Sequence, residues 1–357
     1  MEKQYNLGIV GFGGMAGYHY SELKKFDLRI TPYSVFDVNE ERMQAAREKG
    51  MKTYASFDEM LNDPAVDMVL VSATNEVHKE LSIAAMRAGK HVICEKPVTI
   101  SSAQLEEIMR VRDETGMVFT IDQNRRVNPD FVLMRQCVEK GLIGKPYVIE
   151  SRVEGSRGMP RGWRTIKQLG GGMMLDWGVH LIDQLMYMIN EKVVSVYCKL
   201  YSIEYKEVDD NFTLLLTFAN GLTGMIEVGT NNYITHPRWY VLGEAGTLQI
   251  NDWDCNGEIV RCVEKESEWE PEIVYTKAGP TKTMAPRRPE SVEHIALSSS
   301  EEIERDNNLG TVYRQFVAAI EKTAPLAITA EQAMRVMQVM EAAFESDARG
   351  IAVQTNI

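Results

Sequence analysis

The residues of this sequence best suited to acid–base chemistry are Lys96, Asp176 and His180. Asp176 and His180 stand four positions apart, so on an α-helix their side chains would share one face. Histidine accepts a proton near neutral pH, and a neighbouring carboxylate would orient its ring and stabilise its charged form. Lys96 could donate to a substrate hydroxyl or carbonyl and stabilise negative charge developing there. These residue types favour proton transfer at an oxygen-bearing group.

Each of these signals also has a plainer interpretation. The Asp–His pair is compatible with an ordinary contact along a helix, and Glu95-Lys96-Pro97 with a solvated turn. Pro97 would fix the geometry of that turn, and a cis peptide bond before it is one way to do so. Asp183 could join or flank the face of His180. We expect no metal site, because no further His or Cys stands at ligand spacing from this pair.

A second group of residues is typical of a loop that binds phosphate. The run Gly11-Phe12-Gly13-Gly14-Met15-Ala16 has the form G-x-G-x-x-A, directly after the apolar segment YNLGIV and before a helical pattern. The first glycine permits the tight turn, the second lets backbone approach a pyrophosphate, and the alanine allows close packing of helix on strand. The free N–H groups of the helix would face the phosphates. The alternative is an ordinary strand-to-helix turn.

Asp37 supports the nucleotide interpretation and bears on the choice of cofactor. It ends the next apolar segment, SVFD, about 20 residues after the glycine run, where an acidic residue hydrogen-bonds a ribose hydroxyl. A carboxylate there repels a 2′-phosphate, so we expect NAD, with NADP less favoured. Arg42, on the following helix, leaves room for a phosphate.

The segments that must position these residues change character along the chain. Up to about residue 123, short apolar runs alternate with helical patterns, which predicts βαβ units and a parallel sheet. Beyond it, longer strand patterns separated by turns such as Asn220-Gly221 predict a mostly antiparallel sheet. We expect helices near 129–140, 174–190, 309–322 and 330–346, and an irregular surface loop over 277–300. The fold class is α/β, with a Rossmann domain over 1–125 and an α+β domain over 126–357, whose last helices could pack back on the first.

Length and composition agree with this division. The chain has 357 residues, which favours two domains, and its formal net charge of −12 argues against nucleic acid or an anionic membrane surface as a partner. No apolar run reaches the roughly 18 residues needed to span a bilayer. Five scattered cysteines without a C-x-x-C pair favour a reducing, cytoplasmic location.

Taken together, the motifs resemble a known family. The sequence is similar over nearly the whole chain to the glucose–fructose oxidoreductase / inositol 2-dehydrogenase / MocA (Gfo/Idh/MocA) family of NAD(P)-dependent oxidoreductases. The motifs that carry the resemblance are, in order, GFGGMA, VSATNEVHKELSIAAMRAGKHVICEKP, QNRRVNP and GGGMMLDWGVHLID. The resemblance implies a C-terminal domain with a large open sheet, through which family members pair as homodimers or homotetramers.

The resemblance also implies roles for individual residues. Lys96 would be the active-site lysine beside the reacting hydroxyl and the nicotinamide, and His180 the general base, with Asp176 tuning it or binding substrate. Many members have a proline between the residues matching Thr74 and Asn75, and this sequence lacks it. The other residues placed by the resemblance are, near the cofactor, Thr74, Asn75, His78, Glu95 and Arg164, and, near the substrate, Asn124 and Arg125.

The activity that follows is hydride transfer between nicotinamide and a secondary alcohol of a sugar, cyclitol or sugar derivative. His180 would take the hydroxyl proton and Lys96 would stabilise the oxygen. One alternative is an NAD-using glycoside hydrolase that oxidises its substrate transiently and eliminates. Another is a non-catalytic NAD-binding sensor, although a sensor would not need Lys96, Asp176 and His180 together.

Overall fold

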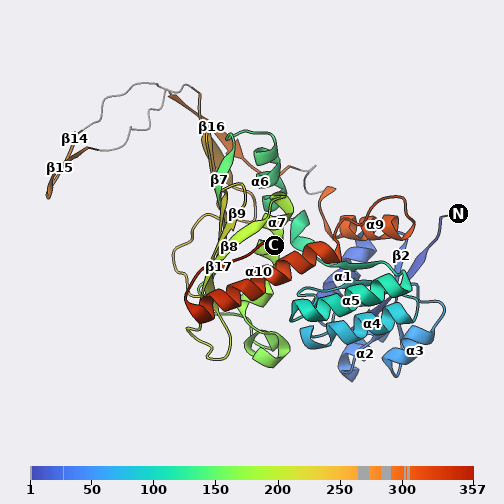
Figure 1. The fold of residues 1–357 in the computed structure, drawn as a ribbon. Helices are drawn as coiled ribbons and strands as arrows, with labels where there is room; N and C mark the ends of the chain where they lie inside the picture. Colours follow the sequence, from blue (N-terminus) through green and yellow to red (C-terminus); the bar gives the residue numbers. More distant parts are fainter. Residues whose placement is uncertain (1, 27, 264–272, 283–290, 301–302, 304–305) are drawn as a thin grey trace.

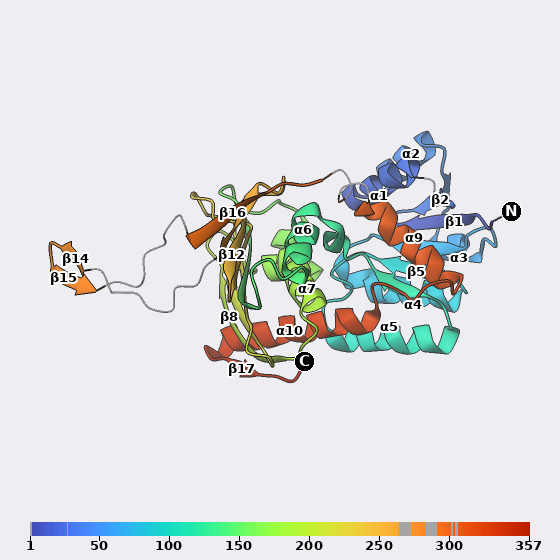
Figure 2. The same ribbon diagram turned by 90° about the horizontal axis from the view of Figure 1, so that it is seen from above.

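The structure, a computed structural model, describes residues 2–26, 28–263, 273–282, 291–300, 303 and 306–357. Its strands form a six-stranded sheet near the N-terminus and a nine-stranded sheet further along the chain, side by side in Figure 1. A two-stranded hairpin stands away from both sheets in Figures 1 and 2. The fold is therefore α/β, with two sheets of different construction.

The first sheet is parallel throughout, with strand order β3-β2-β1-β4-β5-β6. Its central strand β4 is apolar and fully buried, as expected when helices cover both faces. The strand order reverses between β1 and β4, and in such sheets ligands bind beyond the carboxyl ends of the strands at this point. The strands are β1 (Tyr5–Val10), β2 (Ile30–Phe36), β3 (Lys52–Thr53), β4 (Met68–Val71), β5 (His91–Cys94) and β6 (Phe119–Ile121). The helices between them are α1 (Gly14–Lys25), α2 (Glu40–Glu48), α3 (Phe57–Asn62), α4 (His78–Arg87) and α5 (Ser102–Thr115).

The second sheet is mixed and mostly antiparallel, with order β16-β13-β12-β11-β7-β10-β9-β8-β17. Only β7 and β10 run parallel among its described pairs. Its strands are β7 (Pro146–Glu154), β8 (Val193–Tyr201), β9 (Asn211–Phe218), β10 (Thr223–Gly229), β11 (Trp239–Gly243), β12 (Gly246–Ile250), β13 (Gly257–Cys262), β16 (Val292–Leu297) and β17 (Val353–Gln354), and the separate hairpin is β14 (Ile273–Thr276) with β15 (Gly279–Lys282). Its helices are α6 (Pro129–Glu139) and α7 (Val179–Met188).

The two helices near the end of the chain connect the sheets. α9 (Leu309–Ile320) packs against α1, on the first sheet. α10 (Ala330–Arg349) contacts β8 and α7 over part of its length and α5 and β6 over the rest, and Figure 2 shows it running from one sheet to the other. Both sheets are thus held against one helix, which fixes the position of residues from one relative to residues from the other.

Two local expectations need correction, and one strand was not predicted. The predicted loop over 277–300 contains β15 and β16, while residues 283–290 lie outside the described part. The predicted helix over 174–190 begins as a π-helical stretch, Met174–Gly178, and becomes α-helical only at Val179. The two-residue strand β17 carries no sequence signal of its own, because its pairing with β8 is a tertiary contact. The boundary at residues 125/126 stays a prediction.

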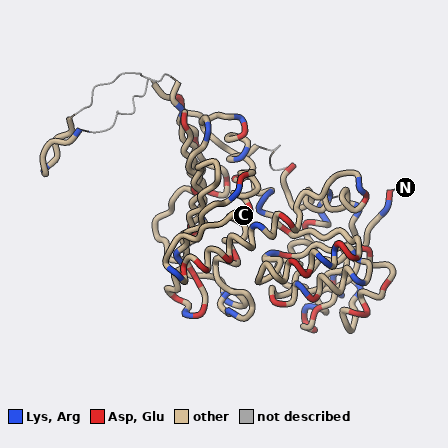
Figure 3. Tube along the Cα trace, viewed as in Figure 1, with Lys and Arg blue, Asp and Glu red and all other residues tan. Residues whose placement is uncertain are grey.

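Charged residues of both signs are interspersed over both parts of the molecule (Figure 3). Among the described residues, no helix is long and apolar enough to cross a membrane.

Candidate functional site

Lys96 and Asp176, predicted from separate motifs, are in direct contact in the structure. Lys96 follows β5 at the carboxyl edge of the first sheet, and Asp176 lies in the π-helical stretch before α7. The Lys96 Nζ donates to the Asp176 Oδ1 and to its carbonyl oxygen, each at 2.9 Å. Arg164, from the 3-10 turn Trp163–Thr165, donates its Nε to the Asp176 Oδ2 at 2.6 Å. One buried carboxylate therefore holds two cations.

The charge state of Asp176 follows from these contacts. Burial raises the pKa of the Asp176 carboxyl, but the charges and hydrogen bonds of Lys96 and Arg164 outweigh it and hold the pKa below its ordinary value. The carboxylate is ionised at neutral pH. Its role is to anchor the ammonium of Lys96.

His180 is only 3% exposed, and its environment differs from the expected one. Neither oxygen of Asp176 bonds to it, since both are used by Lys96 and Arg164. Burial, and then the charges of Lys96 and other cations, keep the pKa of His180 well below its ordinary value. The expectation that a carboxylate stabilises its charged form is therefore wrong. The π-helical stretch is one physical reason, because its hydrogen bonds join residues five apart rather than four.

The Nδ1 of His180 is buried and has no hydrogen-bond partner among the described residues. The ring lies at an angle of 60° to that of Trp177, with 5.8 Å between the centroids. A buried, unpaired ring nitrogen on a neutral imidazole is a candidate proton acceptor. Asp183 does not join this face, because it forms a two-point ion pair with Arg126 at 2.6 and 2.7 Å.

An arginine–tryptophan stack borders this histidine. The guanidinium carbon of Arg125 lies 4.9 Å from the ring centre of Trp177 and 5.6 Å from that of Trp253. Arg238 stacks on Trp253 from a distance of 4.6 Å. The Arg125 Nε is buried without a hydrogen-bond partner in the described part of the chain. Trp253, in the turn between β12 and β13, was not predicted, and only its place in space reveals it.

The glycine run forms the turn that the sequence predicts. Gly11 has φ +85°, and a Cβ there would lie 2.5 Å from the Ser72 carbonyl oxygen, so only glycine fits. Gly13 caps α1 without a side-chain hydrogen bond, and Ala16 is fully buried against the sheet. Gly14 and Met15 begin the helix itself. The first turn of α1 thus presents backbone N–H groups that its own side chains do not cap.

Asp37 lies beside this turn. Its Oδ2 accepts from the backbone N–H of Phe12 at 2.6 Å, and its Oδ1 accepts from that of Asn39 at 2.8 Å. Arg42 donates to the same Oδ2 at 3.3 Å and is half exposed. The residue types expected at an adenosine ribose are therefore next to the glycine turn.

The remaining predicted residues fall into contacts within the protein. His78 is fully buried, with its ring nitrogens 2.9 Å from the Pro97 carbonyl and 3.2 Å from the Ala73 carbonyl. Asn75 donates to the Gly170 carbonyl at 3.2 Å, and Thr74 donates to Glu76 at 2.6 Å.

Two further predicted residues are next to Lys96 and Arg125 in the chain. Glu95 is buried and faces His19, on α1. Asn124 is in a 3-10 turn with Arg125, and its buried Oδ1 has no hydrogen-bond partner in the part of the chain that the structure describes. The Lys96–Pro97 peptide bond is cis, as the proline suggested.

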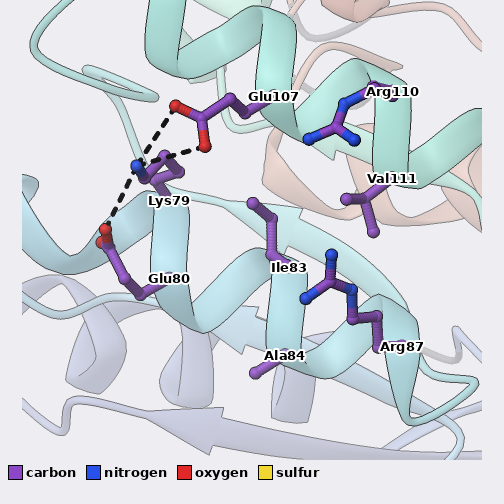
Figure 4. Close-up of a pocket in the computed structure, with 8 residues that line it drawn as sticks. All are labelled: Lys79, Glu80, Ile83, Ala84, Arg87, Glu107, Arg110 and Val111. Atoms are coloured by element: carbon purple, nitrogen blue, oxygen red, sulfur yellow. Dashed lines mark hydrogen bonds and ion pairs between the residues drawn. The ribbon is translucent and has the colours of Figure 1, made fainter.

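A surface pocket lies elsewhere. It measures about 340 Å³ between α4 and α5, on the helical layer that covers the first sheet (Figure 4). None of the predicted site residues lines it. Its lining residues are Lys79, Glu80, Ile83, Ala84, Arg87, Glu107, Arg110 and Val111.

Comparison with known proteins agrees with both halves of the fold. The model of the oxidoreductase family, NAD-binding Rossmann fold, matches residues 5–123, and that of the GFO/IDH/MocA C-terminal domain matches residues 131–249. A myo-inositol 2-dehydrogenase from Thermotoga maritima is 32% identical over 228 residues, which are 62% of this chain and 67% of the relative. The scyllo-inositol 2-dehydrogenase (NADP(+)) IolW from Bacillus subtilis is 24% identical, over 95% of this chain and 93% of its own length.

A solved structure extends the likeness over the full length. The crystal structure of an NAD-binding protein from Listeria innocua is 41% identical, with a TM-score of 0.93, and the match covers 99% of this chain and 100% of that chain. Since family models match both sheets and relatives named as dehydrogenases align with the chain, this protein is an oxidoreductase of the GFO/IDH/MocA family.

Proposed function

We propose that this oxidoreductase transfers a hydride between NAD and a secondary alcohol of a sugar, cyclitol or related polyol. The observation that carries the proposal is the pair of Lys96, held 2.9 Å from the Asp176 carboxylate, and a buried His180 whose Nδ1 has no partner in the described chain. The named relatives act on inositols, which supports this substrate class.

The glycine turn fits a dinucleotide. Gly11 permits the turn against the Ser72 backbone, Gly13 has no side chain to keep a pyrophosphate away from the backbone, and the first N–H groups of α1 have no side-chain cap and would bind its oxygens. Asp37 would hold the adenosine ribose. When bound, NAD supplies the hydride acceptor, which no side chain of the protein can replace.

Residues of the protein accept the proton of the substrate hydroxyl and stabilise the charge on its oxygen. His180, kept neutral by burial and by nearby cations, accepts the proton of the substrate hydroxyl. Lys96 donates to the same oxygen and stabilises its negative charge, while Asp176, itself held by Arg164, keeps Lys96 in position. In the reverse direction His180 returns the proton to the forming alcohol.

Arg125 is the residue we assign to the neighbouring substrate hydroxyls. Two indole rings hold its guanidinium, which leaves its N–H groups available for oxygen acceptors. Asn124 and Trp253 would contribute to the same wall. A polyol, with hydroxyls on adjacent carbons, matches such a row of donors.

Asp37 supports NAD over NADP as the cofactor. The residue is 7% exposed, and its carboxylate would lie against a 2′-phosphate if one were present. Arg42 contacts Asp37 and would compensate only part of that repulsion.

The test is a panel of cyclitols, aldoses and sugar acids, incubated with the full-length protein and NAD while NADH absorbance is followed. We expect net NADH with at least one polyol and a loss of about 100-fold or more in kcat for Lys96→Met and for His180→Asn. Lys199→Met is the matched control, because this lysine pairs with Asp347 on the surface of β8.

Two outcomes would contradict the proposal. Release of a free sugar from glycosides without net NADH would identify a glycoside hydrolase that recycles its cofactor. NADH binding without turnover of any compound in the panel would identify a binding protein.

A further inference from the structure

A second cluster of ionisable groups lies beneath the candidate site, centred on a histidine that the sequence motifs do not single out. His19 is on α1 and is fully buried. Its Nε2 lies 2.8 Å from the Glu95 Oε1 and 3.3 Å from the Asp122 Oδ2. Its Nδ1 lies 2.7 Å from the hydroxyl of Tyr313, on α9. One imidazole therefore faces two carboxylates and a phenol, all within the protein interior.

The two carboxylates come from adjacent strand ends. Glu95 directly follows β5 and Asp122 directly follows β6, and these strands pair in parallel. Asp122 is 0% exposed, and neither of its oxygens has a hydrogen bond from any described donor. Two buried carboxylates this close to each other need a compensating positive charge. The nearest group able to supply one is His19.

The charge states agree with this geometry. Burial lowers the pKa of His19, but the negative charges of Asp122 and Glu95 and the hydrogen bond to Glu95 outweigh it and raise the pKa to about 10. Burial raises the pKa of Glu95, but His19 and Lys96 outweigh it and the pKa lies below its ordinary value. For Asp122, burial prevails and the pKa is raised. At neutral pH the cluster contains an imidazolium paired with the Glu95 carboxylate.

The cluster is connected to the site through Glu95. While its Oε1 faces His19, its Oε2 accepts from the backbone N–H of Lys96 at 3.2 Å. The same Lys96 extends its Nζ to Asp176. His19 is also on the helix that begins at the glycine turn, so it ties this helix to the Lys96 turn.

We propose that His19 is a positioning residue of the reaction. As an imidazolium between Glu95 and Asp122, it orients the Glu95 carboxylate, which accepts from the backbone N–H of Lys96. The Glu95 carboxylate thereby sets where the Lys96 ammonium meets Asp176 and the substrate oxygen. Tyr313 fixes the second nitrogen of the ring, so α9 completes the cluster. The proposal rests on the function proposed above for Lys96. It adds three residues, His19, Asp122 and Tyr313, to those named in the proposed function.

The side chains of His19, Glu95 and Asp122 are also of the types that bind metals, and their ligand atoms lie within 4.8 Å of one another. The 2.8 Å separation of Nε2 from the Glu95 oxygen is that of a charge-assisted hydrogen bond, with the proton between the two atoms. The geometry therefore favours a proton over a metal ion, and metal content is one result of the test.

The first arm of the test needs no substrate. The full-length protein is labelled with [6-13C]lysine, and the Cε resonance of Lys96 is assigned as the one absent from Lys96→Arg. In His19→Gln we expect this resonance to shift, because the Lys96 turn relaxes, while the Kd for NADH changes by less than about threefold. His91→Gln is the matched control: His91 begins β5, at the opposite edge of the sheet, and its variant should leave the resonance unchanged.

The second arm measures turnover with the panel compound that wild type oxidises. Displacing a catalytic group by about 1 Å can cost about 100-fold, so we expect kcat of His19→Gln to fall about 10- to 100-fold while the KM for NAD stays within threefold. Tyr313→Phe removes only a hydroxyl and should shift the Lys96 resonance in the same direction, with a smaller fall in kcat. If His19→Gln does not fold, Tyr313→Phe alone tests whether the cluster positions Lys96.

The results separate the two proposals. If both variants melt at lower temperature while the Lys96 resonance and kcat stay as in wild type, His19 has a packing role only and the inference is wrong. A stoichiometric metal in purified wild type that is lost from His19→Gln would also overturn it. If the resonance moves but wild type oxidises no compound of the panel, the proposed function fails and the positioning of Lys96 by His19 stands.

Discussion

Asp176 is shared by Lys96 and Arg164, and His180 has no acidic partner among the residues that the structure describes. The two side chains therefore have different roles. The carboxylate orients the cation that would stabilise the substrate oxygen, and the histidine stays neutral because its surroundings are positive. A neutral imidazole can accept a proton at a pH where an acid-paired histidine would already be charged.

The pH profile should report this arrangement. Because the pKa of His180 lies well below its ordinary value of 6.5, the acid limb of kcat/KM should lie below pH 6.5 in wild type. Arg125→Gln removes one of the cations that lower this pKa, so its acid limb should move to higher pH, whereas Arg125→Lys keeps the charge and should keep the limb. Identical limbs in all three proteins would show that His180 is not the titrating group.

Asp37 offers a second test at the level of one residue. Asp37→Ser removes the charge that would repel a 2′-phosphate, and we expect the ratio of kcat/KM with NADP to that with NAD to rise about 10-fold or more. Asp37→Asn is the control for folding, because its amide oxygen can still accept from the Phe12 N–H. An unchanged ratio in both variants would assign cofactor choice to other residues, with Arg42 the first to examine.

At the level of elements, how well each feature can be predicted depends on how local its cause is. The glycine turn, Asp37 and the first parallel sheet follow from residues within one βα unit, so their prediction agrees with the structure. The contact of Lys96 with Asp176 joins residues 80 positions apart, and spacing alone does not reveal it. His19 and Trp253 carried no motif, since each becomes notable only through residues brought near it by the fold.

The π-helical stretch is supported at its start by a hydrogen bond to Asp209, and this contact can be tested. The Oδ2 of Asp209, in the segment before β9, accepts from the Met174 N–H at 2.7 Å, at the start of this stretch. Burial raises the pKa of Asp209 from 3.8 to about 6, although hydrogen bonds from Met174 and Met173 oppose the rise. The folded protein therefore holds a proton that the unfolded chain has released, and stability from this group falls as pH rises from about 4 to about 6.

Asp209→Asn removes this titration and keeps an oxygen acceptor for the Met174 N–H. Wild type should therefore lose stability relative to the variant as the pH rises. The melting temperature of the variant minus that of wild type should be larger at pH 7.5 than at pH 5, by about 2 °C or more. A difference that is constant over this range would mean that Asp209 is ionised at pH 5 as well. Asp58→Asn, on the exposed start of α3, makes the same substitution at the surface and provides the comparison.

For the whole molecule, none of the helices that the structure describes covers the face of the second sheet opposite α10 (Figure 2). Residues of β8 alternate, with Val196 and Cys198 buried toward α10 and with Tyr197 and Tyr201 on the other side, 41% and 45% exposed. Exposed tyrosines on a broad sheet are typical of a surface that pairs with another protein. We propose that a second copy of the chain covers this face.

Light scattering after size-exclusion chromatography tests this. We expect a mass of two or four times 40.4 kDa, and a smaller assembly for the double variant Tyr197→Glu/Tyr201→Glu. Val38→Glu, on a residue that is 93% exposed in the first half of the chain, should leave the mass unchanged. A monomeric wild type would contradict the proposal.

The path of the chain through α9 and α10 has a consequence for synthesis on the ribosome. Every strand of the first sheet has been made once Ile121 is released, yet α9 and α10, which cover α1 and α5, come from the last fifty or so residues. Until Tyr313 arrives, His19 and its two carboxylates lie at an open edge of a half-covered sheet. The nascent N-terminal half should therefore bind NADH poorly and need protection from aggregation until the C-terminal helices emerge.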